Sequence, residues 1–163
     1  MKTTTVSIFA TFAFAVLLNS PTANADHHHR TAWWTFLIGT WTYEDSFGKG
    51  EVTYKMAPTG EALVGEWRNA DGTTALEVAG WQADKKIQVV TGYNSVGGYW
   101  HIEFGKITET ACEGPDHGRN RDGVVYDGKI VSTRTDENHW QWDFVGKDGE
   151  GNELKWGGKL TRK

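Results

Sequence analysis

The sequence is poor in the residues that crosslink or interrupt a chain: it has one cysteine, three prolines and no block of like charges. The single cysteine, Cys112, excludes an internal disulfide, so packing alone must hold the fold. No second cysteine and no clear base accompanies it in the sequence. We therefore expect Cys112 to be a small, half-buried residue rather than a reactive thiol.

The charged residues exclude one class of partner. The chain has 17 basic and 21 acidic residues, mixed along its length, and a net charge of -4. Nucleic-acid-binding domains gather basic side chains into a stripe, because neutralising phosphates provides much of their affinity. The sequence has no such stripe, so we expect no nucleic-acid partner.

Long apolar runs are missing except near the amino terminus, where residues 7–18 form one. Lys2 precedes this run, and Ala23-Asn24-Ala25 provides the small residues of a signal-peptidase site. The run is too short to cross a bilayer as a finished helix. We expect residues 1–25 to be a cleaved signal peptide, and the mature chain to be secreted or periplasmic without a membrane span.

Cleavage at that site leaves a chain with the size of one domain. Residues 26–35 would form a His-rich leader and the start of a short helix, because Trp34, Leu37 and Ile38 follow helical spacing. Residues 36–163 would form the folded domain.

Glycine, in contrast, is abundant, with 20 residues. It often follows an aspartate, as in Asp71-Gly72 and Asp148-Gly149, and such pairs favour tight turns between strands. The segments between the turns are short and rich in β-branched and aromatic residues. We expect ten strands, at about residues 40–47, 50–57, 61–69, 73–82, 85–93, 98–107, 109–114, 122–133, 138–146 and 152–162.

Several of these segments alternate apolar and polar residues. In residues 138–146, Trp140, Trp142 and Phe144 share one face, as expected for a strand with one buried side. A meander of one-sided strands usually closes on itself, because closure removes the exposed sheet edges. The predicted fold is all-β: a single antiparallel up-and-down β-barrel of about ten strands with a short N-terminal helix, wide enough to hold a cavity.

Gly39-Thr40-Trp41 follows the helical lead, and a basic residue, Arg162, ends the last predicted strand. Together with the hairpin meander, these residues resemble the calycin superfamily, which includes lipocalins, fatty-acid-binding proteins and nitrobindin-like barrels. Residues 36–67 are similar to secreted bacterial lipocalin-like domains of unknown function. The resemblance implies that Trp41 plugs the barrel base, that Arg162 stacks across its indole, and that Gly39 permits a close approach of the chain.

One-sided aromatic residues around a barrel of this width predict a pocket for a small apolar or aromatic molecule, bound without being transformed. The wall residues that we expect are Tyr54, Met56, Trp67, Tyr93, Trp100, Phe104, Trp140 and Trp142. An envelope interaction protein with a filled core is an alternative.

The sequence shows no motif for an enzyme. It lacks Gly-x-Ser-x-Gly or a similar context for an activated nucleophile. Charged residues on strands usually face solvent, so no catalytic residue is assigned. Only a structure can show whether acidic side chains meet in the cavity; the ones in question are Glu66, Glu77, Glu103 and Asp143.

Two histidines on predicted strands, His101 and His139, are the candidates for a haem-binding or enzymatic barrel, because nitrobindin-like barrels hold haem through a histidine. Each lies opposite the aromatic face of its own strand. If the aromatic faces point inward, both histidines meet solvent; if the polar faces line the cavity, both point in. We expect no stoichiometric haem, since haem also needs an apolar wall beside its ligand. His117, within residues 113–123, is assigned to a turn.

A metal site of another kind involves the mature amino terminus. With Asp26 as the first residue, the free amine, two deprotonated amides and the imidazole of His28 form a four-nitrogen set that suits Cu(II) or Ni(II). The alternative, which we favour, is a solvated His-rich leader without a metal. No cofactor is otherwise expected.

Overall fold

The computed structural model describes residues 34–163. These residues form one antiparallel sheet of eleven strands. The strands are β1 (Gly39–Asp45), β2 (Gly48–Met56), β3 (Ala62–Asn69), β4 (Thr74–Gln82), β5 (Ile87–Asn94), β6 (Tyr99–Phe104), β7 (Lys106–Ile107), β8 (Ala111–Arg119), β9 (Val125–Arg134), β10 (His139–Asp148) and β11 (Glu153–Arg162).

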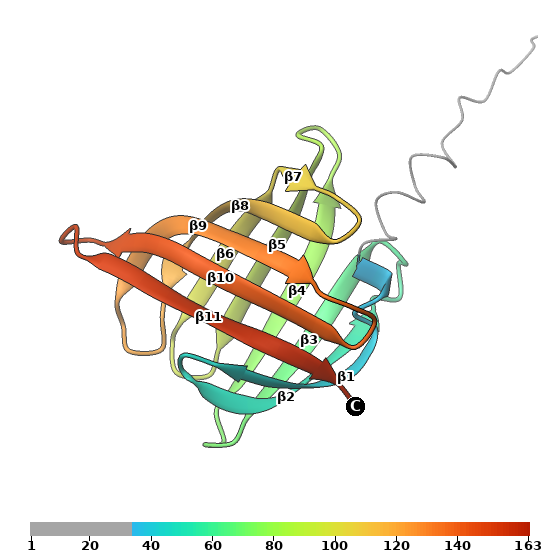
Figure 1. Ribbon diagram of the computed structural model, residues 1–163, viewed down its shortest axis with the longest axis horizontal. Helices are drawn as coiled ribbons and strands as arrows, with labels where there is room; N and C mark the ends of the chain where they lie inside the picture. Colours follow the sequence, from blue (N-terminus) through green and yellow to red (C-terminus); the bar gives the residue numbers. More distant parts are fainter. Residues whose placement is uncertain (1–33) are drawn as a thin grey trace, which may run out of the picture.

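The sheet closes into a barrel (Figure 1). Each strand except β6 pairs with the next along the chain, β6 pairs with β8 instead of β7, and the first strand β1 pairs with the last strand β11. The two-residue strand β7 pairs only with β8, so ten strands make up the wall. The predicted fold class, a closed antiparallel barrel of about ten strands, is confirmed.

Strand β8 differs from the prediction. It continues to Arg119, beyond the predicted end at residue 114 and through residues that were assigned to a loop. Pro115 lies where β8 changes its neighbour: Glu113 pairs with β7, and Asp116 pairs with β6. The missing N–H of Pro115 therefore falls at a break between two ladders, where a strand tolerates proline. The assignment of His117 to a turn was wrong, since it lies within this strand.

Residues before 34 are outside the described part of the chain, so the signal peptide, the His-rich leader, most of the predicted helix and His28 lie there. The described end of that helix is a single turn, in which the backbone N–H of Leu37 donates to Trp34 O at 2.9 Å. Trp34 and Leu37 are both buried under the barrel. Within residues 34–163, no helix is long and apolar enough to cross a membrane.

The strand directions place the turns at two opposite ends of the barrel. The end that carries residues 46–47, 70–73, 95–98, 120–124 and 149–152 is called the mouth. The opposite end, which carries residues 34–38 and the carboxyl terminus of β11, is called the base.

At the base, Arg162 lies over Trp41. The two residues are paired across β1 and β11, and Arg162 Cζ is 4.2 Å from the centroid of the indole ring. Trp41 is fully buried, and its Nε1 donates to Leu37 O at 2.7 Å. The guanidinium also donates to the backbone carbonyls of Ile38, at 3.0 Å, and Phe36. These bonds tie the lead-in turn to the last strand. Gly39 has a positive φ of 128°, and a side chain there would begin 3.1 Å from Arg162 Nη1.

Inside the wall, large side chains alternate with glycines around half of the barrel. Each member of this inner row pairs with the next across neighbouring strands, and the row runs Tyr54, Gly65, Glu77, Gly92, Trp100, Gly118 and Tyr126. The glycines leave room for long side chains to cross a strand. Tyr54 reaches Glu77 over Gly65, and Trp100 reaches Glu77 over Gly92.

This spacing predicts that Gly92→Ala destabilises the barrel. A β-carbon at Gly92 would lie 2.1 Å from Trp100 Cζ2, so the indole must move and lose its bond to Glu77. Such overpacking costs about 1–3 kcal/mol in free energy of unfolding, which denaturant titration measures. Gly80→Ala is the matched control, because nothing lies within 4 Å of its added carbon; its effect should be within about 0.5 kcal/mol. Equal stabilities of the two variants would contradict the spacer role.

Candidate functional site

The barrel encloses a cavity of about 230 Å³ that extends from the base to the mouth. Its wall is mainly aromatic, with polar side chains among the rings. Near the base it is lined by Trp34, Phe104 and Trp140, and near the mouth by Phe47 and Arg121. The closed base leaves the mouth as the route to solvent.

Six of the eight predicted wall residues line this cavity: Tyr54, Trp67, Trp100, Phe104, Trp140 and Trp142. The other two do not. Tyr93 is 64% exposed on the outer face, because the inward positions of β5 are Gln88, Val90 and Gly92. Met56 is half-buried at the base end of β2, outside the cavity lining. Whether the six inner residues contact a ligand stays a prediction.

The rings of the wall hold one another in place. Trp67 makes edge-to-face contacts with Tyr43, Tyr54 and Trp142, at centroid separations of 4.9, 6.2 and 6.3 Å. Such contacts are favourable for aromatic quadrupoles and restrict each ring to one orientation. The aromatic wall is therefore arranged before any ligand enters.

Glu77, on β4, is a buried acid in the cavity wall. Its Oε1 accepts a hydrogen bond from Tyr54 Oη at 2.7 Å, and its Oε2 accepts one from Trp100 Nε1 at 3.2 Å. Burial raises the pKa of the Glu77 carboxyl, while the donors on Tyr54, Trp100 and Trp67 act in the opposite direction. A carboxylate at this position is thus oriented by the hydrogen bonds from Tyr54 and Trp100 and kept away from bulk water.

Asp116, on β8, is a second buried acid that lines the same cavity. Tyr126 Oη donates to its Oδ1 at 3.3 Å. Burial raises the pKa of Asp116 to about 7, with a smaller contribution of the same sign from the charge of Asp127. Asp116 therefore exchanges its proton near neutral pH, which an ordinary aspartate does not.

Of the four acidic residues considered from the sequence, only Glu77 faces the cavity. Glu66 and Asp143 are exposed, and Glu103 is on the outer face with Lys85 3.2 Å away. Asp116 was missed because the part of β8 that holds it was assigned to a loop. The sequence of β4 indicates that Glu77 points inward. Glu77 shares its face of the strand with the small residues Ala75 and Ala79, which leave space inside a barrel for a long polar side chain.

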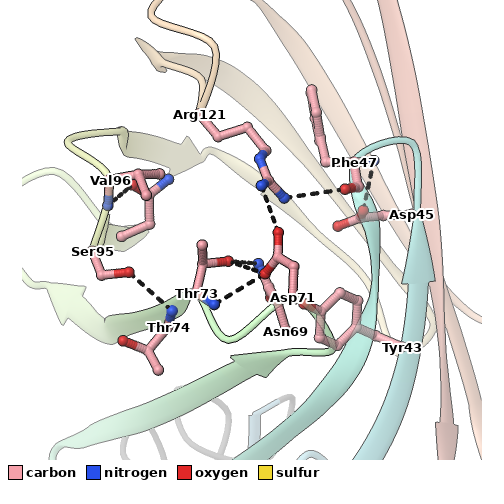
Figure 2. A network of polar contacts seen from close by, with 11 residues as sticks. Tyr43, Asp45, Phe47, Asn69, Asp71, Thr73, Thr74, Ser95, Val96 and Arg121 are labelled. Carbon is pink, nitrogen blue, oxygen red and sulfur yellow. Dashed lines mark hydrogen bonds and ion pairs between the residues drawn. The ribbon is translucent and has the colours of Figure 1, made fainter.

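The mouth carries a polar network that joins three turns (Figure 2). Arg121 Nη2 donates to Asp71 Oδ2 at 2.6 Å, and Arg121 Nη1 donates to Phe47 O at 3.2 Å. Hydrogen bonds from Thr73 and from Arg121 hold the pKa of Asp71 well below its usual range. Below this network Tyr43 donates to Asn69, and burial raises the pKa of the Tyr43 hydroxyl to about 12. The charge of Arg121 is thus paired with that of Asp71 at the mouth.

The three histidines within residues 34–163, His101, His117 and His139, lie on the outside of the barrel. His101 is 2.9 Å from Thr91 Oγ1 through Nδ1, and its ring centroid is 4.9 Å from that of His117 on β8. His139 is exposed and is paired with Asp136 at 2.8 Å. None of the three lines the cavity. Residues 34–163 hold no group of three or more His, Cys, Asp or Glu side chains that could bind a metal ion. The expectation of no bound haem stays a prediction.

Cys112 is more deeply buried than the sequence indicated, with 2% of its surface exposed. Burial raises the pKa of its thiol, and Ser132 next to it offsets this only in part. A buried thiol with a raised pKa is unreactive.

No protein-family model and no curated protein matches the chain. Two solved structures resemble it in outline. One is a redesigned β-barrel, b11L5F_LGL, with 15% identity over 79% of this chain and 93% of that chain, and a TM-score of 0.34. The other is EF1p2_mFAP2b bound to DFHBI, with 19% identity over 82% of this chain and 98% of that chain, and a TM-score of 0.34. At these TM-scores we draw nothing about function from either likeness.

Proposed function

We propose that this protein is a secreted or periplasmic barrel that binds a small aromatic molecule in its cavity. The observation that carries the proposal is the aromatic-walled cavity of about 230 Å³ between the plugged base and the mouth. Concave, mainly apolar sites with a few oriented polar groups are the usual sites for small ligands. The same cavity argues against an envelope interaction protein with a filled core.

The cavity volume limits the size of the ligand. An apolar cavity of about 150 Å³ holds benzene, and the volume here is about 230 Å³. A single ring system with a short substituent fits this space. The ligand rings would pack on the indoles of Trp67, Trp100 and Trp142, whose orientations the edge-to-face contacts and the bond to Glu77 already restrict.

A pair of variants on one strand tests the proposal. Ala75 lines the cavity near the mouth, while its neighbour Leu76 is 51% exposed on the outer face. Wild-type protein should be stabilised against heat by members of a library of one-ring and two-ring compounds, because ligands that bind the folded state raise its Tm. Ala75→Trp should abolish this stabilisation by filling the cavity, and Leu76→Trp should leave it unchanged. The proposal would be contradicted if no compound raised the Tm of the wild type, or if the compounds raised the Tm of the two variants equally.

The proposed location, outside the cytoplasm, rests on the signal-peptide features of residues 1–25 and is tested by the mass of the exported protein. Native mass spectrometry of exported material should give a chain that starts at Asp26. A chain that retains residues 1–25 would contradict secretion by cleavage, and a stoichiometric haem adduct would contradict the expectation of no haem.

A second candidate function, acid–base catalysis in the same cavity, is favoured by Asp116. Its pKa of about 7 suits a group that gives and takes a proton at neutral pH. The two candidates differ in the fate of the ligand. A compound that stabilises the protein and is recovered with its mass unchanged supports binding, whereas a compound recovered with a new mass supports catalysis.

A further inference from the structure

We propose that the cavity selects an organic cation: an aromatic ring that carries an ammonium group, which Glu77 and Asp116 neutralise. This inference rests on the proposed function, because it names the chemical class of the ligand for the same cavity. The proposal stands on the placement of these two buried acids and on the rings around them.

Neither acid has a basic partner in the described part of the chain. The salt bridges there involve other acids, and none includes Glu77 or Asp116. The groups that face Glu77 are Tyr54 from β2, Trp67 from β3 and Trp100 from β6, and all of them are neutral. A buried carboxylate that lacks a cation is unfavourable, and an incoming ammonium would supply that partner.

Asp116 faces Tyr126 from β9, and the charge of Asp127, also on β9, acts on it with the same sign as its own. A second negative charge disfavours an anion at this point of the wall and favours a cation. The two acids lie on β4 and β8 and line one cavity. A ligand in this cavity therefore shares it with both acids.

The aromatic residues add to the same preference. The face of an indole or phenol ring carries negative potential and attracts an ammonium within about 6 Å of its centroid. Trp67, Trp100 and Trp142 line the cavity with Glu77. Rings and carboxylates in one wall are complementary to a cation and to no other charge.

The two basic residues that line the cavity are at the mouth and have partners. Arg121 is held by Asp71 and Phe47 O, and Arg119 Nε donates to Gly123 O at 3.2 Å. Within residues 34–163, Glu77 and Asp116 form their hydrogen bonds with Tyr54, Trp100 and Tyr126, and with neither guanidinium. An anionic ligand would thus bring its charge to two acids with no cation beside them.

Three probes of one shape test the inference by calorimetry: phenethylammonium, propylbenzene and 3-phenylpropionate. They carry a positive charge, no charge and a negative charge at the end of the same two-carbon chain on a phenyl ring. At pH 8, phenethylammonium should bind at least about tenfold more tightly than propylbenzene. The carboxylate should bind more weakly than propylbenzene.

Glu77→Gln and Asp116→Asn, separately and together, remove the charges but keep acceptors for Tyr54 and Tyr126. The double variant should lose the tenfold preference and bind propylbenzene as the wild type does, which also shows that it is folded. Glu66→Gln, on the outer face of β3, is the matched control and should keep the preference. The affinity for phenethylammonium should also rise between pH 5 and pH 8 in the wild type but not in the double variant, because burial raises the pKa of both carboxyls, whereas the ammonium itself titrates near pH 10.

The outcomes separate the inference from the proposed function. Equal binding of the charged and neutral probes, or an unchanged preference in the double variant, overturns the inference and leaves an aromatic-binding barrel. Tighter binding of 3-phenylpropionate overturns it as well. If none of the three probes binds, the proposed function fails together with the inference.

Discussion

Trp41→Ala is expected to lower the free energy of unfolding by about 3–5 kcal/mol. The indole is fully buried at the base, and the surrounding strands cannot collapse into the space that it leaves. The variant also loses the hydrogen bond from Nε1 to Leu37 O. A domain of this size has a margin of about 5–15 kcal/mol, so much of its stability depends on this residue.

Arg162→Ala should cost less, about 0.5–2 kcal/mol, because it opens no large void. The loss comes from the contact between the guanidinium and the indole, at 4.2 Å, and from the bonds to Ile38 O and Phe36 O. The share of this cost that comes from the contact with Trp41 must vanish in a variant that lacks the indole.

A double-mutant cycle in chemical denaturant measures that part. The cost of Arg162→Ala should be clearly smaller in the Trp41→Ala background than in the wild type, since residues in contact are energetically coupled. Lys159→Ala, on the same strand with an exposed side chain that reaches Glu44, serves as the uncoupled control. If the costs of Trp41→Ala and Arg162→Ala were additive, the two residues would not act together as the plug of the base.

The stability of the barrel is expected to fall between about pH 4 and pH 7, and Asp116 should account for about 4 kcal/mol of the fall. Burial raises the pKa of this carboxyl from 3.8 to about 7 in the folded state. In that pH range the folded protein holds a proton that the unfolded chain has released. Stability therefore decreases as pH rises, and the contribution of Asp116 is fully present below pH 4 and lost by pH 7.

Asp116→Asn isolates this contribution, because the amide stays neutral at every pH and its oxygen can accept the bond from Tyr126. Unfolding free energies of the wild type and the variant should differ by about 4 kcal/mol more at pH 8 than at pH 4, in favour of the variant. Asp143→Asn, on the exposed face of β10, is the control and should show no such difference. If the free energies of unfolding of Asp116→Asn and the wild type changed in parallel with pH, the raised pKa of Asp116 would be refuted.

The barrel itself was predictable from the sequence. Alternation in β2, β6 and β10 and the Asp-Gly turns indicate one-sided hairpins, and such a meander usually closes because closure removes its exposed edges. Trp41 and Arg162 were predicted at the base by resemblance, and the structure places them in contact there. Alternation was informative in these places because one face of each strand is clearly apolar.

The composition of the cavity was not predictable in the same way. In β4 the more hydrophobic face, with Leu76 and Val78, points outward at 51% and 43% exposure, while Glu77 points inward. In β8, the predicted strand ended at residue 114, so the second half of the strand and Asp116 within it were missed. The sequence alone determined a closed antiparallel barrel, since local periodicity and turn chemistry act within a hairpin, and the position of Trp41 at one end came from the resemblance. Only the tertiary structure decided which acids are buried, because burial inside a barrel depends on the inward faces of strands that are distant in the sequence and meet only when the sheet closes.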